Sequence, residues 1–253
     1  MTDASTATMG AYAAARTRLS GHQKTTKGAP AYSRFVNRPL GRHLAALAYA
    51  AGRTPNQVTT LSAACTFSGI GIIALVRPGT GPAIAVAGLL TVGYALDSAD
   101  GQLARLRGGG SPAGEWLDHV VDAAKTSALH AAVLVSFFRF FGVSDGLLLV
   151  PLLFMVTGST WFFAVVLTDQ LRRARPDDSS TGPASARPSL LRALLALPTD
   201  YGVLCLLFLL LGRGDVFVAA YSLMLAGQSI ILVAALRAWF REFSSQSTPR
   251  ATG

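Results

Sequence analysis

The sequence predicts an all-α polytopic membrane protein, a helical bundle with six transmembrane helices and an N-terminal interfacial helix on the cytoplasmic side. Two observations carry this prediction. The 253 residues are 51% hydrophobic and only 14% charged, whereas soluble domains carry about 25% charged residues. Apolar stretches of about 20 residues, the length that crosses a bilayer, recur along the chain with the charges gathered between them. Because the connections are short, we expect one bundle.

The segment before the first span divides into two parts. Residues 1–30 are rich in Ala, Thr, Ser and Gly without any period, which predicts a disordered tail and no cleavable signal. In residues 31–53, Leu40, Leu44 and Leu47 share one helical face, and Arg42 lies away from it. This pattern is typical of an amphipathic helix that lies on the membrane surface. An ordinary lead-in segment is the alternative.

Residues 54–240 form the predicted six-helix membrane domain, and residues 241–253 form a C-terminal tail. The first span begins at Thr54-Pro55-Asn56-Gln57, where Thr54 caps the helix and Gln57 completes a capping box. Ser111-Pro112 predicts the start of the third span in the same way. The six predicted spans are 55–76, 83–106, 112–138, 147–171, 190–211 and 216–238.

The basic residues predict the orientation, since Lys and Arg concentrate on cytoplasmic loops. Of the 22 Lys and Arg residues, 18 fall on the side that holds both termini and the loop 172–187, three fall on the other side, and Lys125 lies inside a span. We therefore expect both termini in the cytoplasm. The net charge of +9 belongs to the membrane surface, where anionic lipids attract it, and nucleic-acid binding is not expected. The excess of Arg over Lys indicates a GC-rich genome and favours a bacterial plasma membrane.

Four aspartates lie inside the second and third predicted spans, where each charge costs at least about 2.5 to 3.5 kcal/mol. Asp97 and Asp100 share one face of the second span, and Asp118 and Asp122 share one face of the third. The two spans form a hairpin that turns at Gly108-Gly109-Gly110, and the two pairs lie at nearly equal distances in sequence from Gly109. The four carboxylates are therefore expected at one depth, roughly 9 to 15 Å inside the cytoplasmic helix ends.

Carboxylates that converge in this way repel one another unless cations separate them. Hard divalent ions prefer oxygen ligands, so the cluster predicts a site for two Mg²⁺ or Mn²⁺ ions that bridge phosphate oxygens. Protonated aspartates in a proton pathway are the structural alternative. Small residues, Gly101, Ala104 and Gly114, leave space beside the acids, although they also suit close helix packing. Arg105 lies one turn after Gly101 and offers a fork of donors to a phosphate.

These residues spell D-x-x-D-G-x-x-A-R-x8-G-x3-D-x3-D, from Asp97 to Asp122. The pattern resembles the complete signature of the CDP-alcohol phosphotransferase (CDP-alcohol phosphatidyltransferase) family. The resemblance extends more loosely to the six spans, the interfacial helix and the T-P-N-x-x-T start at Thr54 to Thr59. It therefore covers most of the chain after residue 30.

The resemblance implies a role for each motif residue. All four aspartates, Asp97, Asp100, Asp118 and Asp122, would hold the two ions, and Asp122 would also take the proton of the attacking hydroxyl. Seven further residues would contact the CDP-activated donor, namely Asn56, Thr59, Gly101, Ala104, Arg105, Ser111 and Gly114. In the commonest bacterial case the donor is CDP-diacylglycerol, an alcohol acceptor attacks it, and CMP leaves. The family also makes a homodimer plausible.

The acceptor stays open at this stage. The glycine-rich turn is similar to one in actinobacterial phosphatidylinositol phosphate synthases, but Ala123 stands where that branch carries a basic residue, and Lys125 is the nearest base. The loop arginines Arg172, Arg173 and Arg175 suit an acceptor phosphate and membrane anchoring equally well. A membrane transporter or ion pathway is the alternative function, because buried acids also mark cation routes. A prenyl-transfer enzyme fits the spacing less well, and a non-catalytic scaffold predicts the loss of a motif aspartate.

Overall fold

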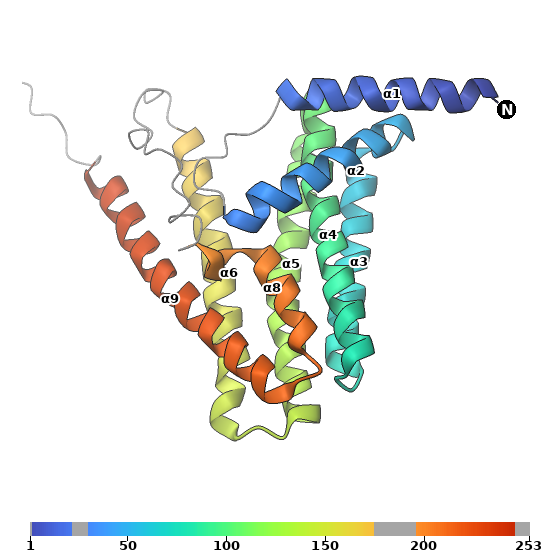
Figure 1. Ribbon diagram of the computed structural model, residues 1–253. Helices are drawn as coiled ribbons and strands as arrows, with labels where there is room; N and C mark the ends of the chain where they lie inside the picture. Colours follow the sequence, from blue (N-terminus) through green and yellow to red (C-terminus); the bar gives the residue numbers. More distant parts are fainter. Residues whose placement is uncertain (1, 22–29, 175–195, 246–253) are drawn as a thin grey trace, which may run out of the picture.

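Helices account for every regular element in the part of the chain that the structure describes, which comprises residues 2–21, 30–174 and 196–245 of the computed structural model (Figure 1). Longer helices are joined by short π and 3₁₀ turns. In chain order the elements are α1 (Thr2–Gly21), η1 (Ser33–Asn37), α2 (Arg38–Ala50), α3 (Pro55–Leu75), α4 (Thr80–Leu106), α5 (Pro112–Ser136), η2 (Phe137–Phe141), α6 (Asp145–Arg173), η3 (Leu197–Thr199), α8 (Tyr201–Leu207), η4 (Phe208–Leu210) and α9 (Gly214–Ser245).

Five helices in the described residues are long and apolar enough to cross a membrane: α3, α4, α5 with η2, α6 and α9. They match five of the predicted spans and confirm a multi-pass helical membrane protein. The remaining prediction, 190–211, is not confirmed as a span. Residues 190–195 lie outside the described part, and Pro198 and the cap residue Asp200 interrupt the rest. The apolar helix that follows, Tyr201–Leu210, is about 15 Å long, half a bilayer core.

The N-terminal segment corrects the prediction of a disordered tail over residues 1–30. Thr2–Gly21 forms helix α1, which lies across one end of the bundle (Figure 1). Alanine favours helix, and α1 buries Ala15 and Leu19 in a cluster with Ala45 and Leu103. Tyr12 packs against the same cluster, and its hydroxyl lies 2.8 Å from His43 Nδ1. The sequence pattern did not reveal this because the contacts join α1 to later helices. Residues 22–29 lie outside the described part.

A helix, α2, is present where the sequence predicts the amphipathic segment, and its place at a membrane surface stays a prediction. Its small residues Gly41, Ala45 and Ala46 are buried, and α2 packs against α4. A Cβ at Gly41 would lie 2.6 Å from the Ser98 hydroxyl, so the two helices approach closely. Leu40 and Leu47 stay exposed, 44% and 55%. This apolar outer face is what a helix at a membrane surface requires.

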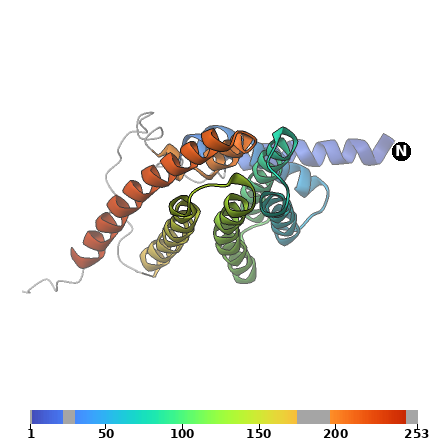
Figure 2. The same ribbon diagram turned by 90° about the horizontal axis from the view of Figure 1, so that it is seen from below.

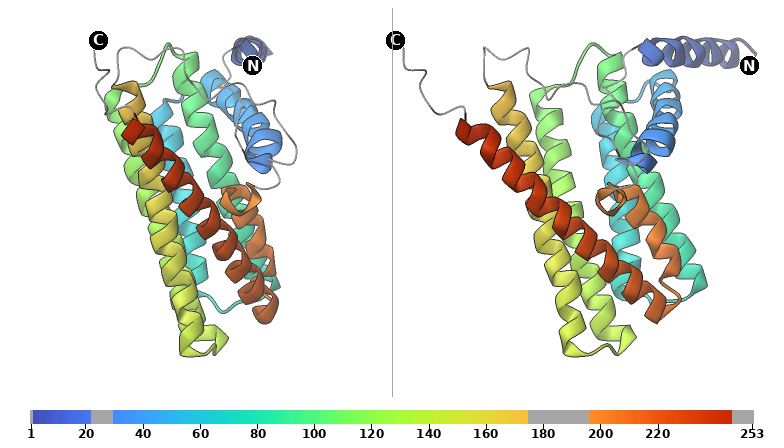
Figure 3. Two further views of the ribbon diagram at one scale, coloured as in Figure 1. Left: turned by 90° about the vertical axis from the view of Figure 1, so that its left-hand side faces the viewer. Right: turned by 60° about the vertical axis from the view of Figure 1, so that its left-hand side comes forward.

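The long helices pack in the order α6, α5, α3, α4, with α8 against α4 (Figure 2). Helix α9 runs obliquely and packs against α6 and α8 (Figure 3). Helices α3 and α4 approach closely at Gly93, whose carbonyl accepts a 2.8 Å hydrogen bond from the buried Ser62 hydroxyl. Large apolar side chains such as Ile230 and Phe163 remain exposed on the outer faces, where lipid would cover them. The packing therefore fixes α4 and α5, the two helices that carry the acids.

Candidate metal and substrate site

The turn between α4 and α5 sets the depth of the acids. Gly108 and Gly109 adopt φ of 96° and 127°, a left-handed region that side chains rarely enter. Helix α5 then begins at Pro112 and is capped by Ser111, whose hydroxyl accepts a 3.0 Å hydrogen bond from the Gly114 amide. The capping box at Thr54 and Gln57 is likewise present at the start of α3. Both predicted helix starts are confirmed, and they fix the register of the helices around the acids.

Three of the four motif carboxylates converge. Asp97 from α4 and Asp118 and Asp122 from α5 each place an oxygen within 4.8 Å of the other two. All three are partly buried. Oxygen atoms at this spacing fit a hard divalent cation, which accepts several carboxylate ligands at once. The hairpin argument from the sequence therefore agrees with the geometry for these three residues.

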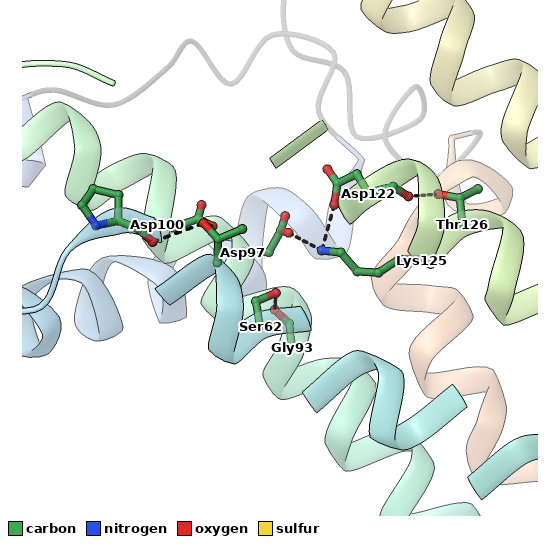
Figure 4. A network of polar contacts seen from close by, with 9 residues as sticks. Ser62, Gly93, Asp97, Asp100, Asp122, Lys125 and Thr126 are labelled. Atoms are coloured by element: carbon green, nitrogen blue, oxygen red, sulfur yellow. Dashed lines mark hydrogen bonds and ion pairs between the residues drawn. The ribbon is translucent and has the colours of Figure 1, made fainter. Parts of the chain in front are cut away.

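Asp100 lies beside this group but outside it. The residue is 5% exposed, and its carboxylate accepts a 2.6 Å hydrogen bond from the Thr59 hydroxyl. Thr59 was expected at the donor site, and here it holds one oxygen of Asp100 in place. The two residues join α3 to α4 next to the converging carboxylates, as the left part of Figure 4 shows for Asp100.

The ammonium of Lys125 bridges two of the acids. Its Nζ lies 2.6 Å from Asp97 Oδ1 and 2.8 Å from Asp122 Oδ1, and the lysine side chain is only 8% exposed (Figure 4). The ion pairs link α4 to α5 and offset part of the negative charge at membrane depth. Lys125 was not among the predicted site residues. Its position inside a predicted span, three residues after Asp122, was the signal that marked it, because an isolated charge there is costly.

A cavity of about 530 Å³, called the large cavity below, opens beside Asp100 and Asp118. Its wall contains every residue that the sequence assigned to the donor: Asn56, Thr59, Gly101, Ala104, Arg105, Ser111 and Gly114. The glycines keep it open, because a Cβ at Gly114 would lie 3.1 Å from Asn56 Oδ1. Three helices, α3, α4 and α5, thus bring these residues to one place.

A second cavity of about 200 Å³, the arginine cavity, shares Asp100, Gly101, Arg105 and Asp118 with the large one. Arg38 enters its wall from the start of α2. The Nε of Arg105 is buried and has no hydrogen-bond partner among the described residues. Two guanidinium groups at the edge of the large cavity suit the oxygens of a phosphate. Sequence reasoning missed Arg38, because the direction of its side chain depends on how α2 packs against α4.

The loop arginines have partners on the helices. Arg172 makes a bidentate ion pair with Glu242, with N···O distances of 2.8 and 2.7 Å, and so joins α6 to α9. Arg173 pairs with Glu115 at 3.0 Å and with Asp169 at 2.7 Å on the rim of the large cavity. Arg175 lies outside the described residues. These pairs favour a structural role for Arg172 and leave Arg173 near the cavity mouth.

Comparison with protein families finds a match to the CDP-alcohol phosphatidyltransferase model over residues 53–239. A curated relative, the phosphatidylinositol phosphate synthase of Corynebacterium glutamicum, is 40% identical over 80 residues. That alignment spans 32% of this chain and 35% of the relative, so the chain matches about a third of its length.

Solved structures share the fold. The phosphatidylinositol phosphate synthase of Mycobacterium tuberculosis with CDP-DAG bound is 20% identical, with a TM-score of 0.53 over 86% of this chain and 97% of that one. A second structure of the same enzyme, in complex with manganese and citrate, is 23% identical, with a TM-score of 0.52 over 86% of this chain and 92% of that one. At these identities the likeness supports the architecture alone.

Proposed function

Because the chain belongs to the CDP-alcohol phosphatidyltransferase family, we propose that it transfers a phosphatidyl group from a CDP-activated lipid to an alcohol and releases CMP. The observation that carries the proposal is the large cavity. Its wall unites all seven residues assigned to the donor with Asp100 and Asp118, beside the converging carboxylates. A transporter is not favoured, because the acids gather on one hairpin beside this cavity.

CDP-diacylglycerol is the proposed donor. One structure with the same fold carries CDP-DAG, and the large cavity lies between α3, α4 and α5, which are long and apolar enough to cross a membrane. Gly101, Ala104 and Gly114 leave room for the cytidine. Arg105, together with Arg38 across the arginine cavity, is placed to bind the diphosphate. Bidentate guanidinium contacts would fix the diphosphate relative to the acids.

Two divalent ions, Mg²⁺ or Mn²⁺, are the proposed cofactors. The oxygens of Asp97, Asp118 and Asp122 fit such a cation, and Asp100 adds a fourth carboxylate whose position Thr59 fixes. A structure with the same fold contains manganese. Bound there, the ions would supply charge stabilisation for the phosphate oxygens.

The residues of the chain supply the remaining steps. The acceptor oxygen attacks the phosphorus that bears the lipid, and Asp122 takes its proton as general base. The bond from this phosphorus to the bridging oxygen of the diphosphate breaks, and the electron pair leaves with CMP.

The proposed location is the plasma membrane, with the hairpin turn, α1 and α2 on the cytoplasmic side. The distribution of Lys and Arg supports this orientation. It places the large cavity where a cytoplasmic acceptor reaches it.

The test is release of CMP from CDP-diacylglycerol by the purified protein in detergent or vesicles, with Mg²⁺ or Mn²⁺. The acceptor panel comprises inositol phosphate, glycerol phosphate, serine, glycerol and myo-inositol. We expect metal-dependent CMP release with at least one acceptor. The absence of CMP release across the panel, in protein that retains its thermal transition, contradicts the proposal.

A further inference from the structure

A third cavity, of about 180 Å³, lies deeper in the bundle than the large cavity and is called the deep cavity here. Its wall contains Asp97, Asp122, Lys125, Tyr94 and Tyr201. Of the four motif acids, Asp100 and Asp118 line the large cavity, and Asp122 lines only the deep one. Asp97 lies between them, because it lines both the arginine cavity and the deep cavity. The converging carboxylates lie between the two spaces.

This division has a consequence for the proposed reaction. In an in-line displacement the attacking oxygen and the leaving oxygen lie on opposite sides of the phosphorus. The cytidine and its phosphate belong to the large cavity, so the attacking hydroxyl must approach from the other side of the acids. The deep cavity occupies that side, and it contains Asp122, the proposed general base.

The deep cavity also has polar groups that are placed to hold a hydroxyl. The Lys125 ammonium carries three N–H donors, and its two short ion pairs use two of them. The hydroxyl of Tyr201 is buried and has no oxygen or nitrogen partner in the described part of the chain. An acceptor oxygen beside Asp122 would give both groups a partner. The Cys205 thiol is the neighbour of this phenol, and sulfur is a weak hydrogen-bond partner, so a further oxygen partner would be favourable.

The charge of the wall indicates which part of the acceptor enters. Two carboxylates face one ammonium, and Lys125 is the only Lys or Arg in this wall among the described residues. Its ammonium is already paired with both carboxylates, so the described wall offers a phosphate no cationic side chain without an acid partner. Tyr94, Phe162 and Tyr201 supply flat apolar surface that suits the carbon skeleton of a small polyol.

We infer that the deep cavity is the acceptor subsite: it receives the uncharged, hydroxyl-bearing part of a polyol, and Lys125 and Tyr201 hold the attacking oxygen beside Asp122. The inference rests on the proposed function. The hydroxyl proton passes to the Asp122 carboxylate, and the oxygen forms its bond to the lipid-bearing phosphorus as the bond to CMP breaks. Lys125 and Tyr201 keep their protons and act by hydrogen bonding alone.

The experiment compares Lys125→Met and Tyr201→Phe with the wild-type protein, using whichever of glycerol, myo-inositol and their monophosphates the wild type turns over fastest. We expect Lys125→Met to raise the KM for the acceptor at least tenfold, and Tyr201→Phe to raise it about threefold. The KM for CDP-diacylglycerol should stay within twofold in both variants. Ser127→Ala is the matched control on α5, because Ser127 bonds to Ser159 and does not line the deep cavity.

Binding of CDP, followed by calorimetry with Mn²⁺ present, gives a second readout, and neither variant should change it by more than twofold. If Lys125→Met does not fold, the result for Tyr201→Phe tests the acceptor assignment. This variant should fold, because the Tyr201 hydroxyl makes no hydrogen bond to oxygen or nitrogen in the described residues. An unchanged acceptor KM in every folded variant overturns the acceptor assignment alone. Failure of the wild type to release CMP with any acceptor overturns the proposed function as well.

Discussion

Replacement of Asp122 by Asn separates proton transfer from metal binding. Asp122 and Asp97 contact the same ammonium, at 2.8 and 2.6 Å, from opposite helices. Either substitution by Asn removes one negative charge and leaves Lys125 paired with the other acid. The two variants therefore disturb the ion-pair network to a similar degree. A difference between them reports what each carboxylate does in the reaction.

The expected loss for Asp122→Asn is that of a general base, about 10² to 10⁴ in kcat. This corresponds to about 2.7 to 5.4 kcal/mol of transition-state stabilisation. Asn keeps the size of the side chain but does not accept the hydroxyl proton, so added metal should not restore the rate. Asp97→Asn should instead weaken metal binding, and a higher Mn²⁺ concentration should recover part of its activity.

The assay measures CMP release against Mn²⁺ concentration for both variants at saturating CDP-diacylglycerol and acceptor. Thermal melting of each purified variant checks that the fold is intact. If Asp122→Asn recovers with Mn²⁺ as fully as Asp97→Asn, its carboxylate acts only as a ligand. Another group, or bulk water, then accepts the proton, and the assignment of Asp122 as base is wrong.

Four further predictions follow from the geometry. Thr59→Val removes a hydrogen bond to a buried carboxylate, worth about 1.5 to 3 kcal/mol, and should lower the Tm in detergent by about 3 to 12 °C; Thr59→Ser should retain the wild-type Tm. Gly93→Ala adds a Cβ that meets a threonine hydroxyl on α3. The substitution should lower the free energy of unfolding by about 1 to 3 kcal/mol, measured by the same melting assay. An unchanged Tm would mean that α3 and α4 move apart at this position without loss of stability. In a protein with Cys65 and Cys205 replaced, a cysteine at the exposed position Ala51 should not react with an impermeant maleimide added to intact cells, and a cysteine at the exposed position Ser144 should react. The reverse pattern would mean that the orientation in the membrane is opposite to the predicted one. EDTA should reduce CDP binding to the purified protein at least tenfold, measured by calorimetry, and undiminished binding would mean that donor affinity does not depend on divalent cations.

The parts of the site that the sequence predicted all depend on local spacing. Asp97, Asp118 and Asp122 converge because helical periodicity and one short glycine turn fix their relative positions. The capping box at Thr54 likewise depends on residues three apart. Five spans followed from hydropathy, since lipid imposes the same length on each of them. Properties that one helix or one hairpin determines were therefore accessible without coordinates.

Properties that depend on packing between distant segments were not accessible. Arg38 reaches the arginine cavity only because α2 packs against α4. Helix α1 depends on side chains such as Ala15 and Leu19, which pack against α2 and α4. The region of the fifth predicted span is apolar enough to suggest a crossing, yet the buried Asp200 caps a short helix there. Its carboxylate accepts the Gly202 amide at 3.1 Å and also the Tyr32 amide at 2.8 Å. Hydropathy cannot predict such a contact, because Tyr32 and Asp200 are 168 residues apart in the sequence.

The charges around the site explain why an acid cluster persists at this depth in a bundle that lipid surrounds. The four carboxylates face three cationic side chains, Arg38, Arg105 and Lys125, which α2, α4 and α5 contribute. The residues alone thus leave an excess of one negative charge, small enough to keep the bundle assembled but of the wrong sign to attract a diphosphate. Each added divalent cation changes that balance by two. Affinity for a CDP-activated donor should therefore depend on the cation, and the two guanidinium groups beside the large cavity then orient a donor that they could not attract on their own.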